Sequence, residues 1–426
     1  ISIITPAQSH VIDSLRLVLA TQKDDTAKVG TLNRLGDKLE MAGRLDSALL
    51  CANTAQALAE KLNFKTGISV ALTHMGYVYE DEGNYAMATQ SYEKALAINK
   101  ETGNKKSISN SLSNLGFLCY EQGNYKKSIE LDSSSLVIAE EVGDKEGMSR
   151  NNGNMAIVYK YQGNYPKALE YDLKALAISE ELSDKEGIAS IQVSIGNIYE
   201  DEDNYPKALE YEFKALEAYE QIGKKYGACA VLSNIGSVYQ EQGDKVKALE
   251  YYFKALTIVQ ELGTKSTTAT ILGNIGDIYF EQGNTPKALV YEFQALTALK
   301  EIKNKEGMAT SLNVIGAIYQ KQADVYKPMQ DADESRRSLH SADIKDSLYK
   351  KALEYYFQAL AVAREIGEKN FMALNMNNIG DVYTMRKSFK AAKTYFDSSL
   401  AVSKSIGGKM NMRDSYRGLT KLDSLT

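Results

Sequence analysis

A small residue recurs at intervals of 40 residues along most of this 426-residue chain. A turn sequence such as Gly163-Asn164-Tyr165-Pro166 follows seven residues later, in more or less complete copies. A fixed period of this size is typical of a repeat array, in which each unit packs only against its neighbours. The periodic small residues are Gly36, Gly76, Gly116, Ala156, Gly196, Gly236, Gly276 and Gly316.

The unit at residues 144–183 predicts a pair of antiparallel helices joined by a tight turn. Asp144 is expected to cap the first helix, and Gly163 to end it in the left-handed conformation that glycine adopts at least cost. Asn164 should cap the second helix, and Pro166 suits its first turn because no amide hydrogen is needed there. The predicted buried stripe of the second helix consists of Ala168, Tyr171, Ala175, Leu176 and Ile178.

Two kinds of position in each unit are expected to serve packing. Small residues such as Gly236 and Ala248 should lie where the paired helices cross, because larger side chains would hold the two backbones apart. Tyrosines such as Tyr159, three residues after the small position, should fill the next slot as packing residues rather than form a cofactor site. The chain accordingly has 28 tyrosines and no tryptophan.

These positions resemble the tetratricopeptide repeat, whose motif appears here as Gly76, Tyr79, Ala88, Tyr92 and Ala95. The resemblance implies an all-α fold, a right-handed superhelix (α-solenoid) of about nine helix-turn-helix repeats over residues 29–406. Residues 1–28 should form an N-terminal capping helix and entry, and residues 407–426 a capping helix or a truncated tenth first helix. The long period is similar to that of Pins-type adaptors, kinesin light chains and bacterial sensor regions.

One unit departs from the period. Gly380 follows Gly316 after 64 residues, so 24 extra residues lie near positions 324–347. This polar segment is expected to form a loop or a short helix between the two helices of the eighth unit. The two alternatives for its role are a passive surface insertion and a lid over the inner, concave face of the array.

Composition and motifs argue against several functional classes. The net charge of -5 and the pI near 5.6 disfavour nucleic-acid binding. No run of about 18 apolar residues predicts a membrane span, and no HExxH, CxxC or phosphate-binding loop occurs. Three isolated cysteines and three distant histidines predict neither a disulfide framework nor a metal site. We therefore expect no catalytic, cofactor-binding or metal-binding residues in this chain.

Asparagine recurs two residues before the small position of the first helix. On a helix this place points away from the crossing with the second helix. In tetratricopeptide proteins the matching place lines the inner groove and bonds the main chain of a bound peptide, a task that suits an amide because it both donates and accepts. A polar, solvated helix residue is the alternative. The predicted groove residues are His74, Asn114, Asn154, Asn234, Asn274 and Asn378.

Carboxylates recur at the ends of the first helices, where they oppose the helix dipole. Such a pattern favours a groove rim that prefers a cationic segment, although a solubilising surface is an equal alternative. The predicted rim residues are Glu80, Asp81, Glu121, Glu200, Asp201, Glu241 and Glu281.

The resemblance implies a non-catalytic scaffold that binds a peptide or a helical segment of another protein in its concave groove. The alternative is the ligand-sensing or dimerising N-terminal region of a larger bacterial signalling protein, such as a histidine kinase, a nucleotide cyclase or a transcriptional regulator. The first reading leaves the compartment open. The second would place the chain outside the cytoplasm if a signal peptide has been removed.

Overall fold

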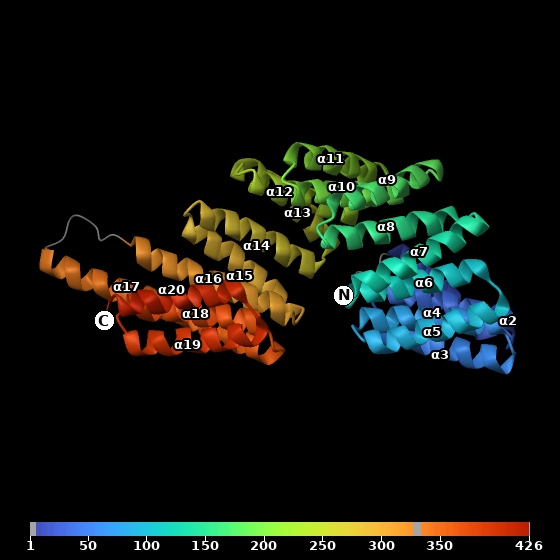
Figure 1. The fold of residues 1–426 in the computed structure, drawn as a ribbon, viewed down its shortest axis with the longest axis horizontal. Coiled ribbons are helices and arrows are strands. Elements are labelled where there is room, and N and C mark those ends of the chain that lie inside the picture. The colour runs from blue at the N-terminus through green and yellow to red at the C-terminus, as the bar shows by residue number, and fades with distance from the viewer. Residues whose placement is uncertain (1–5, 327–333, 426) are drawn as a thin grey trace. The chain divides into compact units, whose positions relative to one another are not determined.

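The computed structural model describes residues 6–326 and 334–425, and in these parts every regular element is an α-helix. The all-α fold predicted from the period is therefore confirmed. The chain forms two compact units, Ile1–Gln242 and Gly243–Thr426. Figure 1 shows antiparallel helix pairs following one another in chain order within each unit. Handedness and repeat number stay predictions.

In the first unit, α1 (Pro6–Thr21) precedes the first helix pair. The helices are α2 (Thr26–Met41), α3 (Leu45–Lys61), α4 (Lys65–Asp81), α5 (Tyr85–Thr102), α6 (Lys105–Glu121), α7 (Tyr125–Val142), α8 (Lys145–Tyr161), α9 (Tyr165–Glu181), α10 (Lys185–Asp201), α11 (Tyr205–Gln221) and α12 (Lys225–Glu241).

The second unit contains the helices from α13 to α20. Its helices are α13 (Lys245–Leu262), α14 (Lys265–Glu281), α15 (Thr285–Glu301), α16 (Lys305–Val325), α17 (Glu334–Ile366), α18 (Lys369–Met385), α19 (Phe389–Ile406) and α20 (Lys409–Asp423). None of the helices in the described part of the chain has the length and apolar character needed to cross a membrane.

The turn between α8 and α9 forms as its sequence predicts. Gly163 has φ +70°, and the Asn164 side chain accepts a hydrogen bond from the backbone amide of Lys167 at 3.4 Å. Pro166 lies in the first turn of α9. Asp144 occupies the N-cap position of α8, but its side chain caps no amide there and instead pairs with Lys106 at 2.9 Å. The sequence Thr5-Pro6-Ala7-Gln8 also predicts a capping box at the start of α1, but Thr5 lies outside the described residues.

A side chain of the second helix, rather than its backbone, fills the space beside most of the periodic glycines; at Gly36 the nearest atom is the Ala48 carbonyl oxygen. A Cβ added at Gly380 would lie 2.7 Å from the ring of Phe396, and one at Gly316 would lie 2.7 Å from the ring of Tyr356. Both rings are almost fully buried. The first helix thus needs glycine because the second helix inserts a large side chain into the gap.

The recurrent tyrosines of the first helices serve packing, as predicted. Tyr159 stacks on Tyr171 of the paired helix with ring centroids 5.4 Å apart, and the Lys167 ammonium lies 4.9 Å from the Tyr159 centroid. Such ring pairs and cation contacts add stability beyond the area they bury. Equivalent stacks are Tyr199–Tyr211, Tyr279–Tyr291, Tyr319–Tyr355 and Tyr383–Tyr395.

The described part of the 24-residue insertion extends two existing helices instead of forming a loop or a separate short helix. Helix α16 has 21 residues and α17 has 33, whereas most helices have 17 or 18; residues 327–333 lie outside the described part. Polar contacts hold the extensions. Tyr349 donates from its hydroxyl to Asp324 at 2.6 Å, and Arg386 Nε donates to Asp346 at 2.7 Å. These bonds join α17 to both α16 and α18.

Helix α20 covers the open side of the last pair. A Cβ added at Gly418 would collide with the ring of Phe396, so α20 lies directly against α19. Leu422 is 4% exposed, and Ser415 donates to Asn377 Oδ1 at 2.8 Å on α18. The apolar edge left by α18 and α19 is thereby buried.

Candidate functional site

The predicted groove residues lie on the first helices of successive pairs. First helices of neighbouring pairs contact one another directly: α2 with α4, α6 with α8 and α8 with α10 in the first unit, and α16 with α18 in the second. All six predicted side chains are partly exposed rather than sealed between units. His74, Asn114, Asn154 and Asn234 lie in the first compact unit, and Asn274 and Asn378 in the second.

Three of the asparagines direct their amide nitrogens toward the preceding helix pair. Asn154 Nδ2 donates to Ser113 Oγ at 3.2 Å and to Asp132 Oδ1 at 3.3 Å. Asn114 Nδ2 donates to the Tyr77 hydroxyl at 3.2 Å. At the corresponding place of another pair, Asn234 Nδ2 donates to Glu212 Oε1 at 3.1 Å.

These bonds constrain what the asparagines can offer to a ligand. A carboxyl oxygen that carries no proton, in the ionised or in the neutral acid, only accepts hydrogen bonds, so the amide beside it turns its nitrogen inward. Both hydrogens of Asn154 are engaged, because its nitrogen has two acceptors. In this arrangement the Asn154 side chain can offer a ligand only its carbonyl oxygen.

The acceptors on the second helices are buried acids that the sequence analysis did not single out. Where other units place Tyr92 or Phe396 beside the glycine, these units place a carboxylate, as with Asp132 beside Gly116. The sequence signal that could have identified these acids is their position in the repeat. They occupy the place of Tyr92 and Phe396, which is buried in the other repeats. The four acids are Asp132, Asp172, Glu212 and Glu292, each no more than 2% exposed.

Burial raises the pKa of these acids far above the usual range. It raises the pKa of Asp132 to about 7, although hydrogen bonds from Asn154 and Ser128 oppose the shift. Burial likewise raises the pKa of Asp172 to about 7, against a hydrogen bond from Ser194. For Glu212, burial raises the pKa to about 8. These groups change charge near neutral pH because the neutral form is easier to bury.

Glu292 in the second unit follows the same pattern. Burial, and after it the nearby carboxylate of Asp277, raise the pKa of Glu292 to about 8. A hydrogen bond from Ser311 lowers the pKa of Glu292. In the next pair, the position that corresponds to Asn154 and Asn234 is Val314, whose side chain cannot donate a hydrogen bond.

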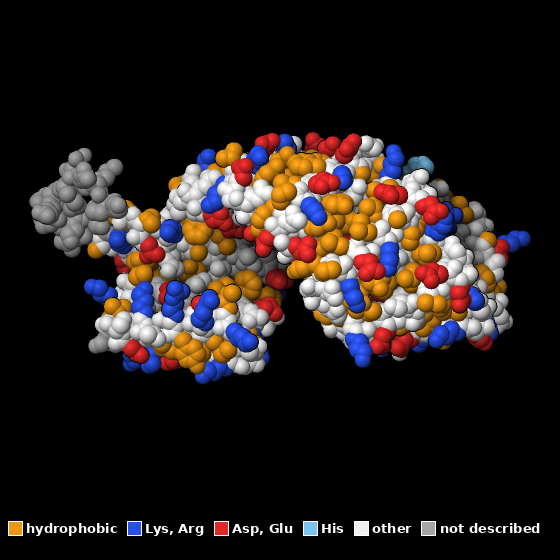
Figure 2. All heavy atoms as spheres, turned by 45° about the horizontal axis from the view of Figure 1, so that its top comes forward, with side chains coloured by type: hydrophobic (Ala, Val, Ile, Leu, Met, Phe, Trp, Pro, Cys, Tyr) orange, Lys and Arg blue, Asp and Glu red, His pale blue; other side chains and the backbone are white. Residues whose placement is uncertain are grey.

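The predicted rim carboxylates divide by environment. Burial raises the pKa of Glu80 and of Glu200, which accept hydrogen bonds from Tyr92 at 2.9 Å and Ser237 at 3.0 Å. Others make surface contacts: Tyr85 donates to Glu121, Lys160 pairs with Asp201, and Lys245 pairs with Glu281. Asp81 and Glu241 are exposed. Acidic and basic side chains are interspersed on the face drawn in Figure 2, and the cationic preference stays a prediction.

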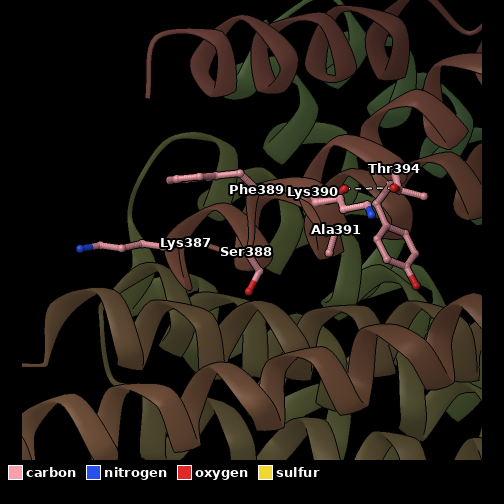
Figure 3. A pocket seen from close by; sticks show the side chains of 7 residues that line it. Lys387, Ser388, Phe389, Lys390, Ala391 and Thr394 are labelled. Atoms are coloured by element: carbon pink, nitrogen blue, oxygen red, sulfur yellow. Dashed lines mark hydrogen bonds between the residues drawn. The ribbon is translucent and has the colours of Figure 1, made fainter. Parts of the chain in front are cut away.

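Two hollows open on the described surface. The larger, about 760 Å³, lies along the start of α19 and is shown in Figure 3. Its lining comes from one short stretch, with Lys387 extending outward and Thr394 donating to the Lys390 carbonyl, and it contains none of the predicted groove residues. The second, about 390 Å³, lies between α2 and α4 and includes His74.

In the described ranges, no group of three His, Cys, Asp or Glu side chains is arranged to hold a metal ion. Cys51, Cys119 and Cys229 are not joined in disulfide bonds, and burial raises the pKa of each thiol. A raised pKa disfavours the reactive thiolate.

Helix pairs that follow one another, most of them with a glycine against an inserted side chain, define an α-solenoid of helical repeats. The Tetratricopeptide repeat profile matches residues 67–141, 147–221 and 227–301, more than half of the chain. The chain belongs to the tetratricopeptide repeat family. No curated protein matches its sequence.

Solved structures with the same fold have diverged far in sequence. A signal transduction ATPase with numerous domains and a tetratricopeptide repeat sensor, from Pyrococcus horikoshii, is 15% identical with a TM-score of 0.58 over 86% of this chain and 55% of that chain. The quorum sensor NprR from B. thuringiensis is 16% identical with a TM-score of 0.52 over 85% and 98%. RapI is 17% identical with a TM-score of 0.51 over 65% and 99%.

Proposed function

We propose that this chain is a non-catalytic protein-interaction scaffold that binds a peptide or a helical segment on the face formed by its first helices. The observation that carries this proposal is the row of partly exposed side chains at one register, occupied by His74 and five asparagines. Asparagine is a poor helix former, so its recurrence within helices calls for a reason other than helix stability.

The contacts within the row favour a ligand that donates hydrogen bonds. Asn154 has both its hydrogens engaged and Asn234 donates to Glu212, so each amide turns its oxygen away from the acid that holds it. Main-chain N–H groups of an extended peptide are donors of this kind and are independent of its sequence. We expect the exposed carboxylates of Asp81 and Glu241 to favour a cationic partner.

A peptide-display selection tests this proposal. Peptides selected from a random 12-residue library on the wild-type chain are then measured by calorimetry with the double variant Asn154→Ser, Asn234→Ser. Serine keeps a donor for the buried acid, as Ser194 does natively for Asp172 at 2.7 Å, but removes the amide oxygen. Affinity should fall roughly tenfold or more, because the peptide N–H groups lose their acceptors.

The control is Asn53→Ser on α3, where the amide donates only to its own helix, at the Leu49 carbonyl. This change should leave affinity unaltered. Equal binding by the wild type and the double variant would refute the asparagine row as the binding element. Binding that is unaffected by added salt would refute the cationic preference.

A second candidate function is the sensor region of a larger signalling protein. The observation favouring it is the similarity in fold to an ATPase with a tetratricopeptide repeat sensor and to a quorum sensor. In this proposal residues 29–406 act as the array, and residues 1–28 and 407–426 as its caps. Sequencing the codons that flank the chain tests it, since an adjoining output domain is required and stop codons directly after Thr426 would exclude one on that side.

A further inference from the structure

The hollow between α2 and α4 lies at the His74 end of the predicted row. It has a volume of about 390 Å³, enough for an amino-acid residue and its first peptide unit. Its polar lining comprises Asn33, Arg34, Asp37, Thr66 and His74, and its apolar lining comprises Val29, Phe64 and Val70 with Gly30 and Gly67.

Gly30 leaves this space open. A Cβ added at Gly30 would meet no heavy atom within 4 Å, whereas one added at Gly67 would meet Val29 at 2.9 Å. At the register of Gly30, the next units carry Val70, Asn110 and Arg150, which all have side chains. The repeat that contains α2 therefore lacks a side chain at this position, whereas the next three repeats have one.

Two buried polar atoms in this lining have no hydrogen-bond partner. Asn33 is 5% exposed, and its Oδ1 is buried and unpaired, as is His74 Nδ1. Leaving such atoms unpaired is unfavourable, because nothing compensates for their removal from water. Burial lowers the pKa of His74, although Asp37 opposes this, so the imidazole is neutral at pH 7 and one of its nitrogens can accept a hydrogen bond.

Charged side chains also line the hollow. Asp37 contributes a carboxylate, which also pairs with Lys38 through Oδ2 at 2.8 Å, and Arg34 contributes an exposed guanidinium one helical turn away. Asn33, His74 and Asp37 are three acceptors, and an ammonium group has three hydrogens. The guanidinium suits a carbonyl or carboxylate on the neighbouring carbon.

We propose that the hollow between α2 and α4 binds the N-terminal residue of a peptide through its α-ammonium group, with an apolar side chain against Phe64 and Val70. This inference rests on the proposed function and deepens it, because it fixes one end of the bound peptide. A free apolar amino acid has the same chemistry, with its carboxylate meeting Arg34.

The probes are Leu-Ala-Ala-amide, its N-acetylated form and free L-leucine, each titrated to about 5 mM into the full chain. Imidazole NMR signals report directly on the site, because the chain has only three histidines and His74→Gln identifies the relevant one. We expect the free-amine peptide to shift the His74 signals and to bind roughly tenfold or more tightly than the acetylated peptide, which lacks the charge and two of the donors.

Shifts caused by L-leucine with a similar affinity would support the same site and identify free amino acids as its ligands. Equal binding of the free and acetylated peptides would overturn the proposal. Absence of any His74 shift up to the highest concentration would overturn it as well.

Gly30→Leu should abolish binding, because the new side chain fills the hollow. The melting temperature of this variant should not fall, because the leucine side chain enters open space and leucine is a better helix former than glycine. Gly153→Leu is the matched control: it too faces open space, on α8, and should leave binding of these probes unchanged. Unaltered binding by Gly30→Leu would refute the assignment of the ligand to this hollow.

The outcome is separable from that of the groove experiment. Loss of amine selectivity, with the serine variants still weakening the library peptides, would reject this hollow alone. Selective amine binding, with no effect of those serine variants, would reject the asparagine row alone.

Discussion

Replacing one buried acid should remove a defined part of the pH dependence of folding stability. Asp132 is fully buried beside Gly116, and burial raises its pKa to about 7. Its folded state therefore holds a proton more tightly than the unfolded chain, in which an aspartate has a pKa of about 3.9. The stability that this proton provides is complete below about pH 4 and is lost as the pH rises through about 7.

The magnitude follows from the separation of the two pKa values. At pH 8 both folded and unfolded states are ionised, so Asp132 contributes no difference in bound protons. At pH 5 only the folded state keeps the proton, about two pH units below a pKa of about 7. Each unit is worth 1.36 kcal/mol, so the wild type should gain about 3 kcal/mol from this residue between pH 8 and pH 5.

Asp132→Asn provides a neutral side chain of the same shape. Its oxygen can accept from Asn154 Nδ2, and its nitrogen can face Ser128 Oγ, which lies 3.5 Å from the present Oδ2. The variant should therefore fold, be more stable than the wild type at pH 8, and lack the gain of about 3 kcal/mol at pH 5.

Urea unfolding at both pH values, followed by circular dichroism, measures the two stabilities. Hydrogen exchange of amides in α6, α7 and α8 places the change within the array. Glu130→Gln, an exposed change on the same helix, is the control and should respond to pH as the wild type does. An identical change between pH 8 and pH 5 for the wild type and Asp132→Asn would refute the reasoning, because Asp132 would then be ionised throughout in the fold.

Two further predictions concern packing and charge in other parts of the chain. Gly380→Leu should destabilise the second unit by about 3 kcal/mol or more in thermal melts, because the new side chain collides with Phe396. The control Gly153→Ala, whose side chain enters open space, should instead stabilise the chain by up to about 1 kcal/mol. Equal melting temperatures for the two variants would contradict the packing assigned to Gly380. Hydrogen bonds from Lys350 and Arg386 hold the pKa of Asp346 below its usual range. Arg386→Gln should therefore raise that pKa, which carboxyl ¹³C NMR would detect; an unchanged titration would show that the bond is not maintained in solution.

The sequence predicted those features that depend on short-range geometry. Gly163 and Asn164 define their turn through backbone conformation and capping, and both are local properties that repeat with the period. The helix pairs follow from the same repetition, so the sequence was sufficient to predict an all-α solenoid. The insertion was predicted less well, because its helical form depends on contacts such as Asp346 with Arg386, 40 residues away.

The site was predicted only in part. The register of Asn154 placed it on the first helix away from the crossing, but its bonds to Asp132 and Ser113 depend on how successive pairs stack. The four buried acids were not predicted, because a carboxylate within an amphipathic helix is ordinarily expected at the surface. The hollow beside Gly30 depends on the approach of α2 and α4, which the period does not reveal.

The buried acids also make the order of the units matter. Asp132 is matched by Asn154 in the following pair, Asp172 by Ser194, and Glu212 by Asn234. An engineer who cuts and rejoins this chain at unit boundaries would separate each acid from its donor. Such shuffled chains should keep their helices yet assemble poorly, unless every acid-bearing unit travels together with its successor.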